Sequence, residues 1–224
     1  MNRWTVRVAW LLPLATVLAS MALHHVRGAA IAPIIFISQA DFSGPEALVF
    51  TLGLTASGLW QAWTVWAMTQ TAPRPWSMER IVGLSAAGCV AIMANRSMYT
   101  HLNPHILAAM GIFTFGWIWL GLVQRRLRSS GAIRGLAQRQ RALWCVGTGY
   151  VVQFLGAAVA LQVNPDVALP TAGVGHPWWT IAALGEYLLV GGLWWGIVAM
   201  ELDLERIEAW NGVSAEAHET LTQR

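Results

Sequence analysis

The chain has 224 residues, of which 56% are hydrophobic and only 11% are charged, with a formal net charge of +3. Soluble domains carry about 25% charged residues, so this composition excludes an ordinary soluble domain and indicates an all-α integral membrane protein. The positive charge gives no reason to expect nucleic acid as a partner, because the basic residues stand in the connections between apolar runs.

Six apolar runs have the length that the hydrocarbon core of a bilayer requires, about 17 to 25 residues. Their approximate bounds are 7–23, 46–69, 79–95, 104–123, 141–162 and 177–200. They predict one bundle of six transmembrane helices over residues 1–200, followed by a polar tail over 201–224. We interpret the first run as a retained helix rather than a signal peptide, because its loss would unbalance the topology predicted next.

The arginines predict the orientation of the bundle. Twelve of the fourteen arginines lie near the N-terminus, in the connections at 70–80 and 124–141, or in the tail, while Arg27 and Arg96 fall on the other side. The positive-inside rule therefore places both termini in the cytoplasm. The use of arginine in place of lysine indicates a high-GC genome, and a bacterial protein would lie in the plasma (inner) membrane. Whether the tail binds a protein partner stays open.

Tryptophans and cysteines support the same picture. Tryptophan pairs near the predicted helix ends, such as Trp117 with Trp119 and Trp178 with Trp179, are typical of anchors at the membrane interface. Cys89 and Cys145 both fall inside apolar runs, so we expect free thiols rather than a disulfide.

Ionisable residues within the predicted spans gather toward one side of the membrane. Glu46 opens the second run just after Pro45, His105 opens the fourth, and Glu186 lies about 13 Å into the sixth at 1.5 Å per residue. Under the predicted topology, all three belong to the outer half of the bilayer. Because ionisable groups in spans are costly and usually face a bundle interior, we predict a polar site there. His105, Glu46 and Glu186 are its candidate catalytic residues.

Each of these residues also has a plainer interpretation. Glu46 suits the first turn of a helix, where the helix dipole favours a carboxylate. His105 could face water at the interface, and Glu186 could belong to a structural ion pair with His105 or Arg96. The sequence alone does not decide between these interpretations and a site.

Candidate binding residues surround the same region: Asp41, Asn95, Arg96, Ser57 and Gln61. Ser57 and Gln61 share a polar helix face with Glu46, because steps of three and four place residues on one side of a helix. Ordinary helix packing is the alternative for this face, since small residues and hydroxyls let helices approach. No histidine spacing matches a known zinc motif, so we predict no metal site and no cofactor.

The segment over residues 36–50, FISQADFSGPEALVF, resembles a signature of the DRAM family. That group also includes the post-GPI-attachment lipid-remodelling proteins, described as FGF-receptor-activating-protein-like. The match falls on Ile37, Ser38, Pro45, Glu46 and Phe50, while Gly44 stands where the family often has proline. Further similar positions are Ala94-Asn95, His105 and Glu186-Tyr187. The resemblance implies six spans, cytoplasmic termini and a role in handling membrane lipid.

Two hypotheses for the function follow, and whether the protein is an enzyme stays open. In the first, it modifies a lipid by acyl or headgroup transfer, with His105 as general base, Glu46 or Glu186 orienting the imidazole, and a substrate hydroxyl as nucleophile. In the second, it is a non-enzymatic lipid-binding or scaffold protein that holds a headgroup near Arg96. A transporter is disfavoured, because the inner halves of the spans carry almost no charge.

Overall fold

The structure is a computed structural model that describes residues 3–30, 34–70, 77–129, 131, 133–163 and 177–204. These residues form six long α-helices and two short 3-10 helices, with no strand among them, so the all-α prediction is confirmed. The elements in chain order are α1 (Arg3–Val26), η1 (Ile37–Ala40), α2 (Pro45–Thr69), α3 (Met78–Ala94), α4 (Leu102–Ser129), α5 (Leu136–Val163), α6 (Pro177–Met200) and η2 (Glu201–Asp203).

Each long helix falls on one of the six predicted apolar runs. The largest differences are in α4 and α5, which have 28 residues each and extend into the arginine-rich connection predicted as a loop. Arginine and glutamine are good helix formers, so the helices continue after the apolar runs end. Local signals set the other starts: Pro45 stands in the first turn of α2, and Ser77 caps α3 by accepting a hydrogen bond from the backbone N of Arg80 at 3.3 Å.

Four of the helices are long and apolar enough to cross a membrane: α1, α4, α5, and α6 together with η2. This indicates a membrane protein. The other two do not reach the same standard, because α3 has only 17 residues and α2 carries the polar face described above. Six crossings and the orientation of the termini therefore stay predictions.

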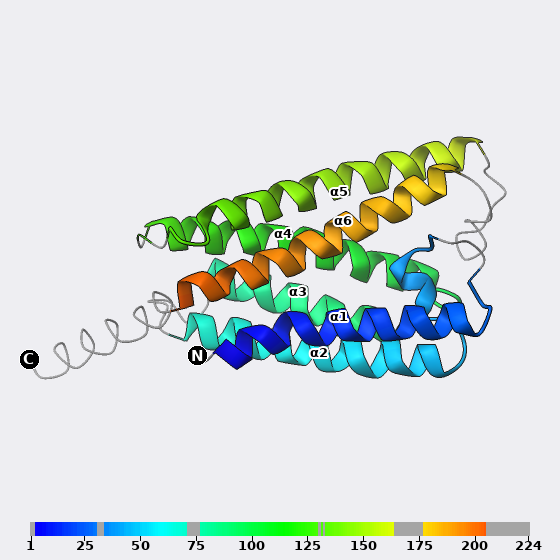
Figure 1. The fold of residues 1–224 in the computed structure, drawn as a ribbon, viewed down its shortest axis with the longest axis horizontal. Coiled ribbons are helices and arrows are strands. Elements are labelled where there is room, and N and C mark those ends of the chain that lie inside the picture. The colour runs from blue at the N-terminus through cyan, green and yellow to red at the C-terminus, as the bar shows by residue number, and fades with distance from the viewer. Residues whose placement is uncertain are drawn as a thin grey trace, which may run out of the picture.

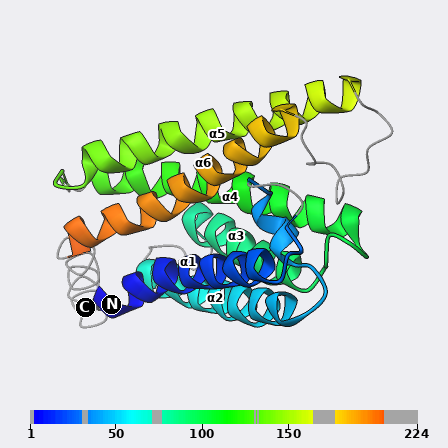
Figure 2. The same ribbon diagram turned by 45° about the vertical axis from the view of Figure 1, so that its right-hand side comes forward.

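The helices run alternately in opposite directions along one long axis (Figure 1). The helix α5 packs mainly against α6, while α1, α2, α3 and α4 pack in sequence against one another. The helix α6 contacts both α1 and α4, and so closes a ring of five helices with α5 outside it (Figure 2). Glycines allow the closest approach: a Cβ on Gly149 of α5 would lie 2.6 Å from the backbone N of Leu189 in α6.

The two ends of the bundle differ in chemistry. At one end, called here the arginine-rich end, Arg7 pairs with Glu201 at 3.1 Å, and the buried Arg139 pairs with the buried Asp203. These pairs join α1 and α5 to η2, directly after α6. The opposite end, called here the η1 end, holds η1, the start of α2 and the start of α4 (Figure 1).

Candidate functional site

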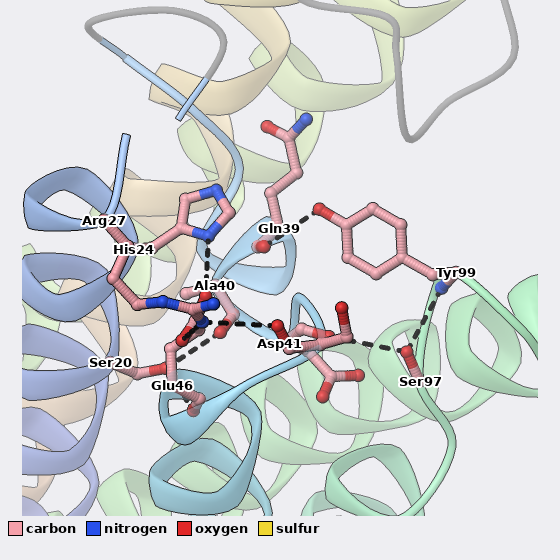
Figure 3. Close-up of polar contacts among 10 residues, drawn as sticks. Ser20, His24, Arg27, Gln39, Ala40, Asp41, Glu46, Ser97 and Tyr99 are labelled. Carbon is pink, nitrogen blue, oxygen red and sulfur yellow. Dashed lines mark hydrogen bonds and ion pairs between the residues drawn. The ribbon is translucent and has the colours of Figure 1, made fainter. Parts of the chain in front are cut away.

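The backbone of residues 34–44, which includes η1, accepts hydrogen bonds from side chains of three different parts of the chain. The hydroxyl of Ser20 in α1 donates to the carbonyl of Ala40 at 2.9 Å, and that of Tyr99, between α3 and α4, donates to the carbonyl of Gln39 at 3.0 Å (Figure 3). From α6, the hydroxyl of Tyr187 donates to the carbonyl of Ile35 at 2.8 Å. These hydrogen bonds hold the segment across the end of the helix bundle.

Glu186 of α6 also binds this segment. Its side chain is buried, and its Oε2 accepts a hydrogen bond from the backbone N of Ile37 at 2.6 Å, with a further backbone hydrogen bond from Ser38. The carboxylate thus sits at the start of η1, where unpaired amides favour an anion. Within the described residues neither His105 nor Arg96 pairs with Glu186, so the alternative of a structural ion pair is not observed, and backbone amides bind the carboxylate.

Glu46 is fully buried at the start of α2 and forms the centre of a charged cluster. Its Oε2 pairs with Nη1 of Arg27, and its Oε1 lies 3.7 Å from Nδ1 of the buried His24 (Figure 3). At that distance Glu46 Oε1 and His24 Nδ1 form no direct hydrogen bond, and both atoms are buried without another partner. Neither His24 nor Arg27 was predicted as a site residue, although His24 lies in the last turn of α1 and Arg27 directly follows that helix.

Gly44 is explained by the same cluster. Its φ of +140° lies in the region that favours glycine, and a Cβ there would overlap the guanidinium of Arg27. Proline holds φ near −65°, so a proline at this position would not fit this turn.

Asp41 is buried between η1 and α2, close to the connection between α3 and α4. Its burial raises the pKa of the carboxyl to about 6, although hydrogen bonds from Ser97 and the backbone of Met98 act in the opposite direction. Its Oδ2 has no hydrogen-bond partner. Burial, together with the negative charges of Asp41 and Glu46, raises the pKa of Tyr99 to about 12, so this hydroxyl stays protonated and remains a donor.

His105 is buried at the start of α4, and its Nδ1 lies 2.5 Å from the backbone carbonyl of Arg96. A carbonyl only accepts, so Nδ1 carries the proton and Nε2 presents a lone pair when the ring is neutral. Nε2 is buried and has no hydrogen-bond partner. In the described part of the chain neither Glu46 nor Glu186 is bonded to the ring, so the Arg96 carbonyl orients it instead.

The four remaining candidate binding residues are divided between surface and packing roles. Asn95 donates to the hydroxyl of Thr55 at 2.8 Å, and it lines a shallow surface depression together with the exposed Arg96. Ser57 is buried and donates to its own helix at Gly53, while Gln61 donates to the carbonyl of Ala9 in α1 at 3.0 Å. These contacts on α2 are those of the packing alternative.

Over the residues that the structure describes, no group of three or more His, Cys, Asp or Glu side chains could hold a metal ion. The η1 end instead holds four buried polar atoms without a hydrogen-bond partner: Asp41 Oδ2, Glu46 Oε1, His24 Nδ1 and His105 Nε2. The Glu46 and His24 atoms face each other at 3.7 Å. We call these four residues the polar site. Comparisons with protein-family models, with curated proteins and with solved structures found no match to this chain.

Proposed function

We propose that this protein crosses the membrane six times and binds a membrane lipid by its headgroup at the η1 end. The observation that carries the proposal is the polar site. Buried polar atoms are nearly always hydrogen-bonded, and leaving one unpaired costs about 1 to 3 kcal/mol. Four such atoms near one end of a bundle favour a polar ligand that completes them.

The chemistry of the site favours a particular kind of headgroup. Asp41 and Glu46 are acceptors when ionised, and Nε2 of neutral His105 is an acceptor too, so the ligand must donate. Hydroxyl or ammonium groups on a phospholipid or glycolipid headgroup supply such donors. The exposed guanidinium of Arg96 stands at the same end, where it can bind a phosphate.

The orientation follows from the arginines. The described arginines other than Arg27 and Arg96 lie toward the arginine-rich end, which would face the cytoplasm under the positive-inside rule. The polar site would then meet lipid headgroups of the outer leaflet. The resemblance of residues 36–50 to the DRAM and lipid-remodelling group supports the same choice of ligand.

The test compares the amount of lipid that co-purifies with the wild type and with two variants, each of which replaces one exposed arginine. In Arg96→Gln, we expect the amount of retained lipid to fall about two- to fivefold, because an exposed ion pair contributes about 0.5 to 1 kcal/mol. Arg128→Gln is the matched control, since Arg128 is also exposed but lies at the arginine-rich end. Native mass spectrometry with lipid identification gives the amounts, and equal retention in the wild type and both variants would contradict the proposal.

A second candidate function is acyl or headgroup transfer, and the geometry of His105 favours it. A buried imidazole with Nδ1 held by a carbonyl and Nε2 unpaired has the form of a general base. If the protein is an enzyme, His105→Ala abolishes the conversion of bound lipid while lipid is still retained. If the bound lipid is recovered chemically unchanged from the wild type as well, the protein is a binder.

A further inference from the structure

An elongated cavity lies inside the ring of five helices and reaches η1 at one end. Its volume is about 120 Å³, and its lining comes from α1, α2, α3, α4 and α6, with Ile37 and Ser38 of η1 at one end. Along α6 the lining extends from Glu186 to Ile197, which is about 16 Å at 1.5 Å per residue. So small a volume over this length makes the cavity a narrow slot parallel to the helix axes.

The lining is apolar with few exceptions. Its larger apolar side chains include Val17, Phe50, Leu54, Val90, Phe113 and Leu120. Three of the polar side chains have partners: Glu186 accepts from Ile37, Gln61 donates to Ala9, and Thr64 donates to Trp60 at 2.9 Å. The slot therefore offers a dry surface that suits hydrocarbon, as apolar cavities of about 150 Å³ in other proteins do.

Trp119 of α4 lines the cavity and carries one polar group that has no hydrogen-bond partner. Its side chain is 7% exposed, and its indole Nε1 is buried with no hydrogen-bond partner. The Nε1 edge lies beside Gly83 of α3, which also lines the cavity; a Cβ on that glycine would come within 2.7 Å of Nε1. An indole N–H can only donate, so the missing partner is an acceptor.

We propose that this cavity binds a segment of a single apolar chain carrying a carbonyl or ether oxygen that accepts from Trp119 Nε1, as an acyl ester does. The narrow slot favours a single chain over a fused-ring ligand, and the apolar lining disfavours a polar one. Since Glu186 is the only ionisable residue among the described residues of the lining, a free carboxylate would find no cation among them. The inference deepens the proposed function, on which it rests for the membrane as the source of the ligand.

The experiment uses the full-length protein in nanodiscs and two photoreactive probes with an alkyl diazirine in the chain. One probe is a fatty-acid methyl ester, and the other is the hydrocarbon of the same length without the ester. Mass spectrometry locates the crosslinked residues after illumination. For the wild type we expect crosslinks from both probes on cavity-lining residues of α3, α4 and α6.

Two variants separate the contributions of space and hydrogen bonding. Ala87→Leu adds three carbons at a buried position of the lining and should reduce crosslinking by both probes at least fivefold. Trp119→Phe keeps the ring but removes the N–H, and should reduce crosslinking by the ester about three- to tenfold while leaving the hydrocarbon unchanged. Trp144→Phe, at an exposed tryptophan outside the lining, is the control.

Crosslinks confined to exposed residues such as Leu155, and equal in wild type and Ala87→Leu, would overturn the proposal. Equal loss of both probes in Trp119→Phe would refute the role of the indole N–H. Thermal unfolding of each variant shows whether it is folded, and a folded Ala87→Leu protein that binds as the wild type does also counts against the cavity. Because neither probe has a charged headgroup, a failure at the polar site leaves these results unaffected.

Discussion

The contact between α5 and α6 depends on glycine at Gly149. A Cβ there would lie 2.6 Å from the backbone N of Leu189 and 2.8 Å from the carbonyl oxygen of Gly185, both in α6. Backbone atoms cannot rotate away as the end of a flexible side chain can. Gly149→Ala should therefore force α5 and α6 apart. Their contact is the most extensive between any two helices that the structure describes.

The expected loss of stability follows from two opposing terms. Replacing glycine by alanine in a helix gains about 0.5 to 1 kcal/mol, whereas overpacking a close contact costs about 1 to 3 kcal/mol. Gly191→Ala on α6 is the matched control, because a Cβ there meets nothing within 4 Å. Gly191→Ala gains helix stability without the overpacking cost, so the free energies of unfolding of the two variants should differ by about 1 to 3 kcal/mol.

Thermal unfolding in detergent micelles, followed by circular dichroism, measures this difference. At about 2 to 4 °C per kcal/mol for a chain of this size, Gly149→Ala should unfold about 2 to 12 °C below Gly191→Ala. Equal midpoints for the two variants would show that the helices are not packed as closely as the structure has them.

Three further predictions concern the two ends of the bundle. Because burial raises the pKa of Asp41 from 3.8 to about 6, the folded protein holds this proton more tightly than the unfolded chain does. The free energy of unfolding should fall by about 2 to 3 kcal/mol as the pH rises from about 4 to about 6, then level off, and Asp41→Asn should remove that fall. Asp203→Ala should destabilise the protein by about 3 to 5 kcal/mol in thermal unfolding, because it breaks the buried ion pair with Arg139; a change below 1 kcal/mol would contradict this. Among single-cysteine variants, Thr100→Cys should react with an impermeant maleimide on intact cells and Ser129→Cys only after lysis, and the reverse pattern would refute the orientation.

The positions of the helices could be predicted from the sequence because each apolar run is continuous and sufficiently long. The start of α2 could also be predicted, since Pro45 and Glu46 both suit a first helical turn. The predicted free thiols Cys89 and Cys145 are confirmed, although both are half-buried. These features depend on neighbouring residues or on composition, which a sequence displays directly.

Contacts between distant parts of the chain were harder to predict. Trp119 and Trp179 were expected at the membrane interface, and that is wrong because both are buried inside the bundle. Distance from a helix end does not determine which face a tryptophan occupies. The partner of Glu186 is the backbone of η1, and no pattern of side-chain types reveals a backbone amide.

The arrangement around His105 shows the same limit in the candidate site. From the sequence, Glu46 or Glu186 was predicted to orient the ring of His105, because carboxylates suit this role and all three residues were predicted in the same half of the membrane. The structure bonds its ring to the carbonyl of Arg96, a group that every residue has. The position of His24 and Arg27 beside Glu46 likewise depends on how the end of α1 meets the start of α2.

The most direct test of lipid binding at the η1 end is an experimental density map of the protein in nanodiscs formed from its native membrane. The proposed function predicts headgroup density within hydrogen-bonding distance of Asp41 Oδ2 and His105 Nε2, the buried atoms without partners. The same map should show whether that density reaches Arg96. Ordered water alone around these atoms, with lipid only along the outer faces of the helices, would contradict the proposal.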